Sequence, residues 1–508
     1  MPNAPLRTSR LAPIVIAALL AVGGCAMKPQ KIDADAVAVA GKARLAAVIA
    51  QEEPITGPLS LYEAMARALK YNLDQRIELM DEALRWEQLE LQRFEMMPSL
   101  VASSGFTTRS NEAASRSRSL ASGNQSLEPS TSSERSSHTA DLAASWDVLD
   151  FGLARVRAMQ TADETLISHE RRRKVTNRIL EDVRTAYWRA VSADRTFKKL
   201  VSLQVLAQQA LRESEALEER RLVPPLTILS YQRDLIAVQG EVLKLQRELS
   251  LSKSQLAALI NLAPNTEFTL VLPSRTDVVP ELPGAADDMV LTGLRFRPEV
   301  HEASYRGQIN VLEKQTAFLR TLPSLKGILG INYDNNTYLS HGSWLSASAR
   351  ISWNLLDVFR YPAHKRVLEA ETRVLEQREL ALTMAVATQV HVARLRFQLL
   401  AQELNSIRRS YVVQERILAL SRGGFKAKSV SQQSLVREEM NAVLSEVRYD
   451  SAYADLQNAY ANLYASMGLD NFEIENTDAM PVAKFAAALE AHWNDRALTL
   501  PSMNESEP

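Results

Sequence analysis

The sequence predicts a mainly α-helical protein with a few β-strands, built from two similar halves. Two unusual motifs each occur twice: Met97–Leu100 matches Leu322–Leu325, and Ser145–Asp150 matches Ser352–Asp357. Long stretches rich in Leu, Ala, Glu and Arg favour helices, and short segments between them alternate apolar and polar residues. Repetition at a nearly fixed spacing indicates one architecture made twice, rather than several unrelated domains.

The spacing of the repeats differs slightly between the two motifs. The second pair lies 207 positions apart (352 − 145), and the first pair 225 (322 − 97). The chain between the two motifs is therefore 18 residues longer in the first copy.

Composition excludes several classes of function. The 508 residues include 59 basic and 60 acidic side chains, and this balance gives no reason to expect a nucleic-acid partner. The seven histidines are scattered without metal-ligand spacing, so we expect no metal site and no cofactor. We find no catalytic set either, and we expect a protein that is not an enzyme.

The N-terminus predicts export and a lipid anchor. Residues 1–24 read as a signal peptide, with an apolar core too short for a membrane span, and Cys25 follows as the only cysteine. Val22-Gly23-Gly24-Cys25 resembles a bacterial lipobox, in which the cysteine carries fatty acyl groups such as palmitate. An ordinary signal peptide with a chance cysteine is the alternative. Ala26 after the cysteine favours the outer membrane, by analogy with lipoprotein sorting.

The first half is expected at residues 57–263, after an N-terminal tail at 25–56. Ser60 and Glu63 form a capping box for a helix from Leu61 to about Met96. Strands are predicted at about 99–108 and 138–149. The Ser-rich segment between them reads as a solvated loop on the outside of the cell.

The second half, residues 286–470, repeats this pattern after a linker at 264–285. Its strands are predicted at about 324–334 and 343–354. Each strand has about ten residues, enough to cross an outer membrane when tilted. A soluble, half-buried hairpin would show the same alternation. Aromatic residues near the strand ends favour the membrane; these are Phe106, Trp146, Phe151, Tyr333, Trp344 and Trp353. Four strands cannot close a barrel, so several chains would have to share one.

Each half also contains a very long helix and a returning helix. The long helices are expected from about Gly152 to Arg221 and from about His364 to Arg422. Pro224-Pro225 and Gly423-Gly424 would break them, and the returning helices would end near Asn261 and Gly468. Helices this long must pack side by side as coiled coils. Residues 471–508 read as a C-terminal tail.

These features together resemble the TolC-type outer-membrane factors, over about residues 59–468. The resemblance rests on Leu59–Ala64, on the duplicated Pro-Ser-Leu and Ser-Trp-x-x-x-Asp motifs, and on Ala465–Gly468. It implies a homotrimer in which three chains form one 12-stranded transmembrane β-barrel on a long helical tunnel through the periplasm. It also implies a periplasmic adaptor (membrane fusion protein) and an inner-membrane pump as partners.

The helix tips depart from the family pattern. The first tip, near 222–227, has Arg221 where the family has glycine, and the second, near 423–434, has Lys428. Thr227 and Ser434 occupy the family's aspartate positions. We expect adaptor docking at the two tips, through Leu222, Val223, Pro224, Gly424, Val430 and Ser431. Glu438 or Glu439 could supply a tunnel constriction one turn later.

The sequence thus favours a passive outer-membrane channel of a tripartite efflux system, exporting small molecules such as drugs. Secretion of protein (type I) or polysaccharide is left open by the tip substitutions. A periplasmic coiled-coil scaffold without a pore is the alternative from another class.

Overall fold

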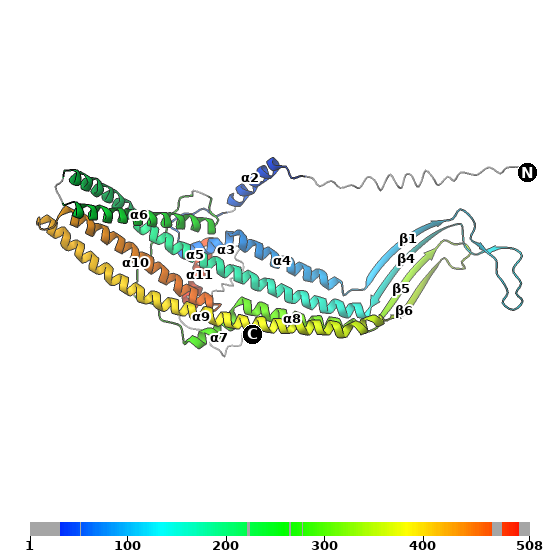
Figure 1. Ribbon diagram of the computed structural model, residues 1–508. Helices are drawn as coiled ribbons and strands as arrows, with labels where there is room; N and C mark the ends of the chain where they lie inside the picture. Colours follow the sequence, from blue (N-terminus) through cyan, green and yellow to red (C-terminus); the bar gives the residue numbers. More distant parts are fainter. Residues whose placement is uncertain are drawn as a thin grey trace, which may run out of the picture. The chain divides into compact units, whose positions relative to one another are not determined.

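Figure 1 shows the computed structural model of the chain, which describes residues 31–50, 52–220, 224–263, 266–276, 278–469 and 480–496. The predicted signal peptide, Cys25, and the tip residues Leu222 and Val223 lie outside these ranges. The chain divides into two compact units, residues 1–54 and 55–508.

The first unit contains a helix that the sequence analysis did not predict. Helix α2 (Ala34–Ala50) lies in the segment expected to be an irregular tail. The segment lacks apolar periodicity, but alanine makes up much of it and is the best helix former. Intrinsic propensity, rather than an amphipathic pattern, explains this helix.

The second unit contains the same series of main elements twice, as predicted. The first half has α3 (Leu61–Tyr71), α4 (Leu73–Phe94), β1 (Ser99–Thr108), β4 (Ser136–Asp147), α5 (Val148–Glu219) and α6 (Pro225–Leu259). The second half has α7 (Ala286–Phe296), α8 (Pro298–Leu319), β5 (Ser324–Asp334), β6 (Ser343–Ser352), α9 (Leu355–Lys426) and α10 (Gln432–Ser466). Helices α5 and α9 have 72 residues each, and α6 and α10 have 35 each. In this unit the strands lie at one end of the long helices and the helix–helix turns at the other (Figure 1).

The predicted helix from Leu61 to Met96 is in fact two helices. Asn72 separates α3 from α4: its side chain accepts hydrogen bonds from the backbone N–H groups of Asp74 (3.0 Å) and Gln75 (3.4 Å). Asn72 thereby caps the second helix at its N-terminus, a role for which asparagine is well suited. Arg297-Pro298 makes the equivalent break between α7 and α8.

Helix α9 runs further than predicted. It passes Gly423-Gly424 without a break and ends at Lys426. A glycine costs a helix only about 1 kcal/mol, which the packing of a long helix readily offsets. The turn comes instead at Lys428, whose φ of 58° cannot continue a helix.

The C-terminal segment contains a packed helix, α11 (Val482–Arg496), which contacts α3. Val482, Phe485 and Leu489 are buried in the core of the first half. Trp493 packs against that core and also against the core of the second half, where its ring centroid is 5.4 Å from that of Tyr464. This helix therefore holds the two halves together.

The segment between the halves is also packed against the helices. The Leu59 N–H donates to the Thr269 carbonyl (2.8 Å), and the Val271 N–H donates to the Leu59 carbonyl (2.9 Å). Phe268 and Leu270 are buried. The described part of the predicted linker is therefore a strap fixed to the helical body.

Candidate functional site

The strands form one antiparallel sheet in the order β1-β4-β5-β6. The register pairs Leu100 with Ala144, Leu142 with Ile331, and Ile331 with Leu345. Strands β4 and β6 begin or end within two residues of the predicted bounds. The central pair, β4 and β5, joins the two halves of the repeat.

This register puts most of the apolar side chains of the four strands on one face. They are Leu100, Ala102, Phe106, Ala140, Leu142, Ala144, Trp146, Leu325, Leu329, Ile331, Tyr333, Leu345, Ala347, Ala349 and Ile351. The other face is mainly polar, and Ser103 donates to Asp141 (2.6 Å) and Asn332 to Ser346 (2.9 Å) across it. A slip of one residue in any pair would mix the faces.

Among the residues that the structure describes, none covers the apolar face. Leu345 is 81% exposed, Ile351 74% and Leu100 68%. An apolar patch of this extent normally meets a membrane or a partner. Strands β1 and β6 are also edges of the sheet, each with ten residues. A single chain therefore leaves both a face and two edges without a partner.

Aromatic side chains lie near both ends of the sheet. Phe106, Tyr333 and Trp344 lie near the loops, whereas Trp146 and Trp353 lie near the long helices. All five are at least 45% exposed. Two such belts are typical of strands that cross a bilayer. Trp344 differs from the others because its register puts it on the polar face.

The second helix tip is a compact turn between α9 and α10. The Ser429 N–H donates to the Gly424 carbonyl (2.8 Å), and Ser431 accepts from the Ser434 N–H (3.2 Å) as the N-cap of α10. A Cβ on Gly424 would lie 2.5 Å from a methyl group of Val430. The Val430 side chain thus packs over Gly424 within the turn. Lys428, where the resemblance expected glycine, takes the left-handed conformation that favours glycine.

The first tip is described only from Pro224 onward. Pro224 precedes α6, and Pro225 occupies its first turn, where proline is well tolerated. Leu226 is exposed. The docking roles predicted for the residues of the two tips stay predictions.

Glu438 and Glu439, expected near a constriction, are each bonded to α9 of the same chain. Gln414 donates to Glu438 (2.8 Å), and Arg422 lies 3.3 Å from Glu439. The Glu439 side chain is 29% exposed. Both carboxylates therefore join the helices of one hairpin, and their role in a constriction stays a prediction.

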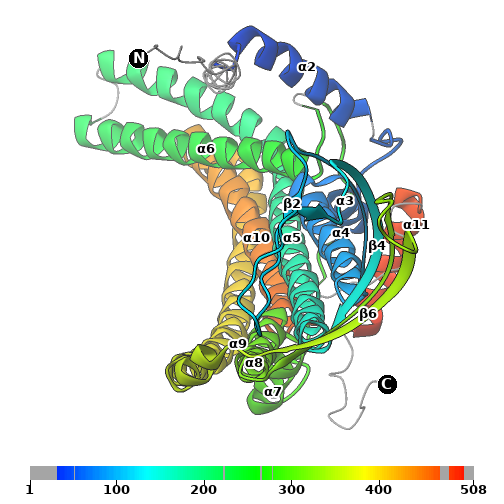
Figure 2. The same cartoon turned by 90° about the vertical axis from the view of Figure 1, so that its right-hand side faces the viewer.

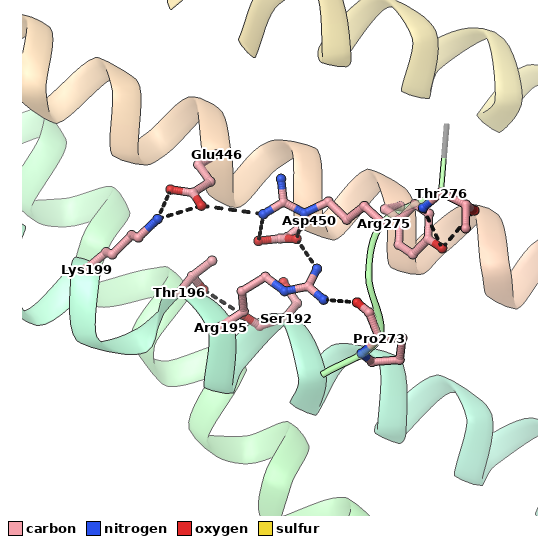
Figure 3. Close-up of polar contacts among 10 residues, drawn as sticks. Ser192, Arg195, Thr196, Lys199, Pro273, Arg275, Thr276, Glu446 and Asp450 are labelled. Carbon is pink, nitrogen blue, oxygen red and sulfur yellow. Dashed lines mark hydrogen bonds and ion pairs between the residues drawn. The ribbon is translucent and has the colours of Figure 1, made fainter. Parts of the chain in front are cut away.

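A cluster of charged side chains around the buried Asp450 joins both halves and the strap (Figure 3). The Asp450 carboxylate on α10 is 1% exposed and accepts from Arg195 on α5 (2.7 Å) and Arg275 on the strap (2.7 Å). Lys199 on α5 donates to Glu446 on α10 (2.6 Å). Burial raises the pKa of Asp450, and the two guanidinium groups oppose that shift.

The sequence analysis did not find this charge cluster. Its members come from segments about 250 and 80 residues apart, as the Arg195–Asp450 and Arg195–Pro273 hydrogen bonds show. No local pattern brings them together. Arg275 in the proline-rich strap was the one available signal. The cluster fixes α5, α10 and the strap in one arrangement, because each buried charge needs its partner.

Two further findings concern the described residues as a whole. No group of three or more His, Cys, Asp or Glu side chains within them is placed to hold a metal ion. None of their helices has a stretch that is long and apolar enough to span a membrane.

Comparison with solved structures identifies the fold. The CmeC outer membrane channel of Campylobacter jejuni matches with a TM-score of 0.63 and 12% identity, over 84% of this chain and 89% of that chain. The open state of the Neisseria gonorrhoeae MtrE outer membrane channel matches with 0.61 and 18%, over 80% and 89%. The outer membrane protein VceC of Vibrio cholerae matches with 0.60 and 14%, over 80% and 96%.

No protein-family model matches the sequence, and no curated protein sequence matches it. The structural likeness shows that the chain has the fold of these outer-membrane channels, as the resemblance predicted.

Proposed function

We propose that the chain is the outer-membrane channel of a tripartite export system and acts as a trimer. The observation that carries this proposal is the four-stranded sheet, with one uncovered apolar face and two open edges. In lipid every backbone polar group must be paired, so the edges must be closed by further strands. Three copies joined edge to edge give a barrel of twelve strands with apolar residues outside and polar residues inside.

The helices of both halves supply the periplasmic part of the duct. A helix of 72 residues is about 110 Å long at ~1.5 Å per residue, which is far longer than a bilayer is thick. The helices extend away from the sheet and would cross the periplasm. There the tips would meet a periplasmic adaptor, which in turn would connect to an inner-membrane pump.

The channel would be passive, with energy supplied by the pump. The lipobox supports attachment of Cys25 to the outer membrane. It also favours small molecules as the cargo, while protein or polysaccharide secretion is the alternative for the same duct.

The uncovered apolar face argues against a scaffold without a pore. A soluble β-domain would cover such a face with its own core. We therefore expect the purified protein to form trimers and to give discrete conductance steps in planar lipid bilayers. Failure to form trimers, or trimers without any conductance step, would contradict the proposal.

A matched pair of substitutions tests the two faces. Leu329 and Ser348 are diagonal neighbours on adjacent strands, one on the apolar face and one on the polar face. Leu329→Arg should block membrane assembly, because a charge facing lipid costs roughly 2–4 kcal/mol in each copy. Ser348→Arg should assemble normally and shift ion selectivity toward anions. Equal assembly of the two variants would contradict the assignment of faces.

The tips are tested separately. Val223→Asp together with Val430→Asp should leave trimers intact and abolish export, measured as accumulation of a fluorescent efflux substrate in cells. Leu226→Asp is the control. It places a charge on an exposed residue near the tip, and Leu226 is not among the residues that we expect to dock the adaptor. Normal export by the double variant would refute the tip assignment, and so would loss of trimers.

A further inference from the structure

The connection between β1 and β4 is much longer than the one between β5 and β6. It spans residues 109–135, whereas the second connection spans only 335–342. The 18 extra residues of the first copy lie here. The two halves otherwise match in the lengths of their long helices, so this connection is the main asymmetry of the repeat.

The connection is folded, and we call residues 109–135 the arm. Strand β2 (Ala114–Ser115) pairs with β3 (Ser130–Thr131), and Arg118 forms a further bridge with Gln125. The Ser119 N–H donates to the Asn124 carbonyl (2.8 Å) and closes the end of the arm. Gly123 has a φ of 74°, which the tight turn requires. The arm is therefore a β-hairpin, and most of its residues are exposed to solvent, as its composition predicted.

Side-chain hydrogen bonds fix the base of the arm to the turn between β5 and β6. Asn336 donates to the Ser132 carbonyl (3.0 Å), and Thr337 donates to Glu134. The Asn335 side chain accepts from the His138 N–H (2.7 Å), where β4 begins. These contacts hold the arm in one direction relative to the sheet.

That direction is toward the concave side of the sheet. Figure 2 looks at the strand end of the molecule; the sheet is seen as an arc, and β2 with the rest of the arm lies inside it. In a closed barrel the concave side is the lumen. A twelve-stranded barrel with strands ~4.8 Å apart and tilted by ~40° has a radius of roughly 12 Å. About twelve extended residues from Arg109 to Leu120 could span up to ~36 Å, so the arm is long enough to reach the axis.

The arm carries two large apolar side chains in open solvent, Leu120 in the turn that closes its end and Leu127 between that turn and the β2–β3 pair. Leu120 and Leu127 are 104% and 93% exposed, above every side chain of the apolar sheet face. In the proposed barrel the concave side faces away from the bilayer, so lipid would not cover these two side chains. The arm also carries charges of both signs, with Arg116 and Arg118 on one side and Glu112 and Glu128 on the other. Because each arm has both signs, the arms of two copies can approach one another without net repulsion.

We propose that the arms of three copies meet over the outer mouth of the duct and narrow it, with Leu120 and Leu127 of each copy packed against those of its neighbours. The partner of the arm is thus a second copy of this chain. This inference rests on the proposed trimeric barrel. Threefold symmetry brings the three arms to one axis. There the exposed leucines of the three copies would bury their apolar surface against one another, which is favourable in water.

Disulfide trapping tests the contact. In Leu120→Cys trimers, mild oxidation should give covalently linked chains, because the three thiols would lie near one axis. Asn111→Cys is the control, since this exposed residue lies near the base of the arm. Linked chains with Leu120→Cys alone support the inference. No linkage, or equal linkage with both variants, overturns it.

Conductance tests the narrowing. Leu120→Ser with Leu127→Ser should raise the single-channel conductance of the intact trimer, and replacing residues 112–132 by a short Gly-Ser turn should raise it further. The double substitution changes only exposed side chains, so it keeps the test valid if the shortened chain does not fold. Unchanged conductance in trimers that conduct would overturn the arm contact alone. A wild-type protein that neither trimerises nor conducts would overturn both this inference and the proposed function.

Discussion

Gly468 follows the last long helix of the repeat. Adding a single methyl group at this position should strongly lower the free energy of unfolding. The φ of Gly468 is +72°, and the residue follows Met467, the C-cap of α10, at the position where a left-handed glycine commonly ends a helix. A Cβ built there lies 2.7 Å from the Phe296 carbonyl carbon and 2.8 Å from both the Phe296 oxygen and the Arg297 nitrogen. These are backbone atoms of the α7–α8 junction, which cannot rotate aside as a side chain can.

Two terms set the size of the effect of Gly468→Ala. The left-handed conformation costs a residue with a Cβ roughly 1–2 kcal/mol. Overpacking against a rigid neighbour costs about 1–3 kcal/mol more. We therefore expect the free energy of unfolding to fall by about 2–5 kcal/mol. The measurement is guanidinium unfolding of the purified protein in detergent, with tryptophan fluorescence as the signal.

The repeat supplies a matched comparison at Asn261, 207 positions earlier (468 − 261), where φ is +61°. Asparagine tolerates this conformation better than other residues with a side chain. Asn261→Gly should change stability by less than about 1 kcal/mol, since it keeps the backbone conformation accessible. If the free energy of unfolding of Gly468→Ala is within about 0.5 kcal/mol of the wild-type value, the argument from the close approach of backbone atoms is wrong.

Four further substitutions test other parts of the structure. Lys428→Gly should stabilise the α9–α10 turn by about 1 kcal/mol, measured as slower amide exchange there, because glycine adopts the left-handed conformation without strain. Asp450→Ala should destabilise the fold by about 3 kcal/mol in guanidinium unfolding, since two largely buried guanidinium groups lose the buried carboxylate that they share. Phe485→Ala should cost about 3–5 kcal/mol and expose α11 to proteolysis, because this side chain is 1% exposed. The hydrogen bond between His301 and Glu170 (3.0 Å) raises the pKa of the histidine; its contribution to stability is thus complete below about pH 6.5 and is lost as the pH rises through the raised pKa. His301→Gln should remove that pH dependence, and an unchanged stability profile between pH 6 and 8 would contradict this assignment.

The sequence predicted the elements whose signals are local and repeated. Alternation of side chains located the strands, and the register confirmed which residues share the apolar face, because a period of two leaves only one consistent pairing. The long helices followed from composition, although α9 begins at Leu355, earlier than the predicted His364, and contains Pro362. The duplicated motifs predicted two equivalent halves, and the equal lengths of α5 and α9 confirm this.

Boundaries were predicted less well where two local effects compete. The break at Asn72 depends on a side-chain cap that offers the backbone an alternative to a continuous helix. Gly423-Gly424 weakens the helix without ending it, because packing of α9 along α10 outweighs the propensity of single residues. The sequence marked the right region for the second break, where a balance of about 1 kcal/mol decided the residue, but it missed the break at Asn72.

Only the tertiary structure decided which distant residues meet. It brought Arg195, Arg275 and Asp450 into one buried cluster and packed α11 across both halves. It also showed that the Ser-rich segment 109–135 is a hairpin with two exposed leucines. Sequence patterns report which face of an element is apolar, whereas contacts between segments hundreds of residues apart depend on how those faces are assembled, and for this reason they could not be predicted from the sequence.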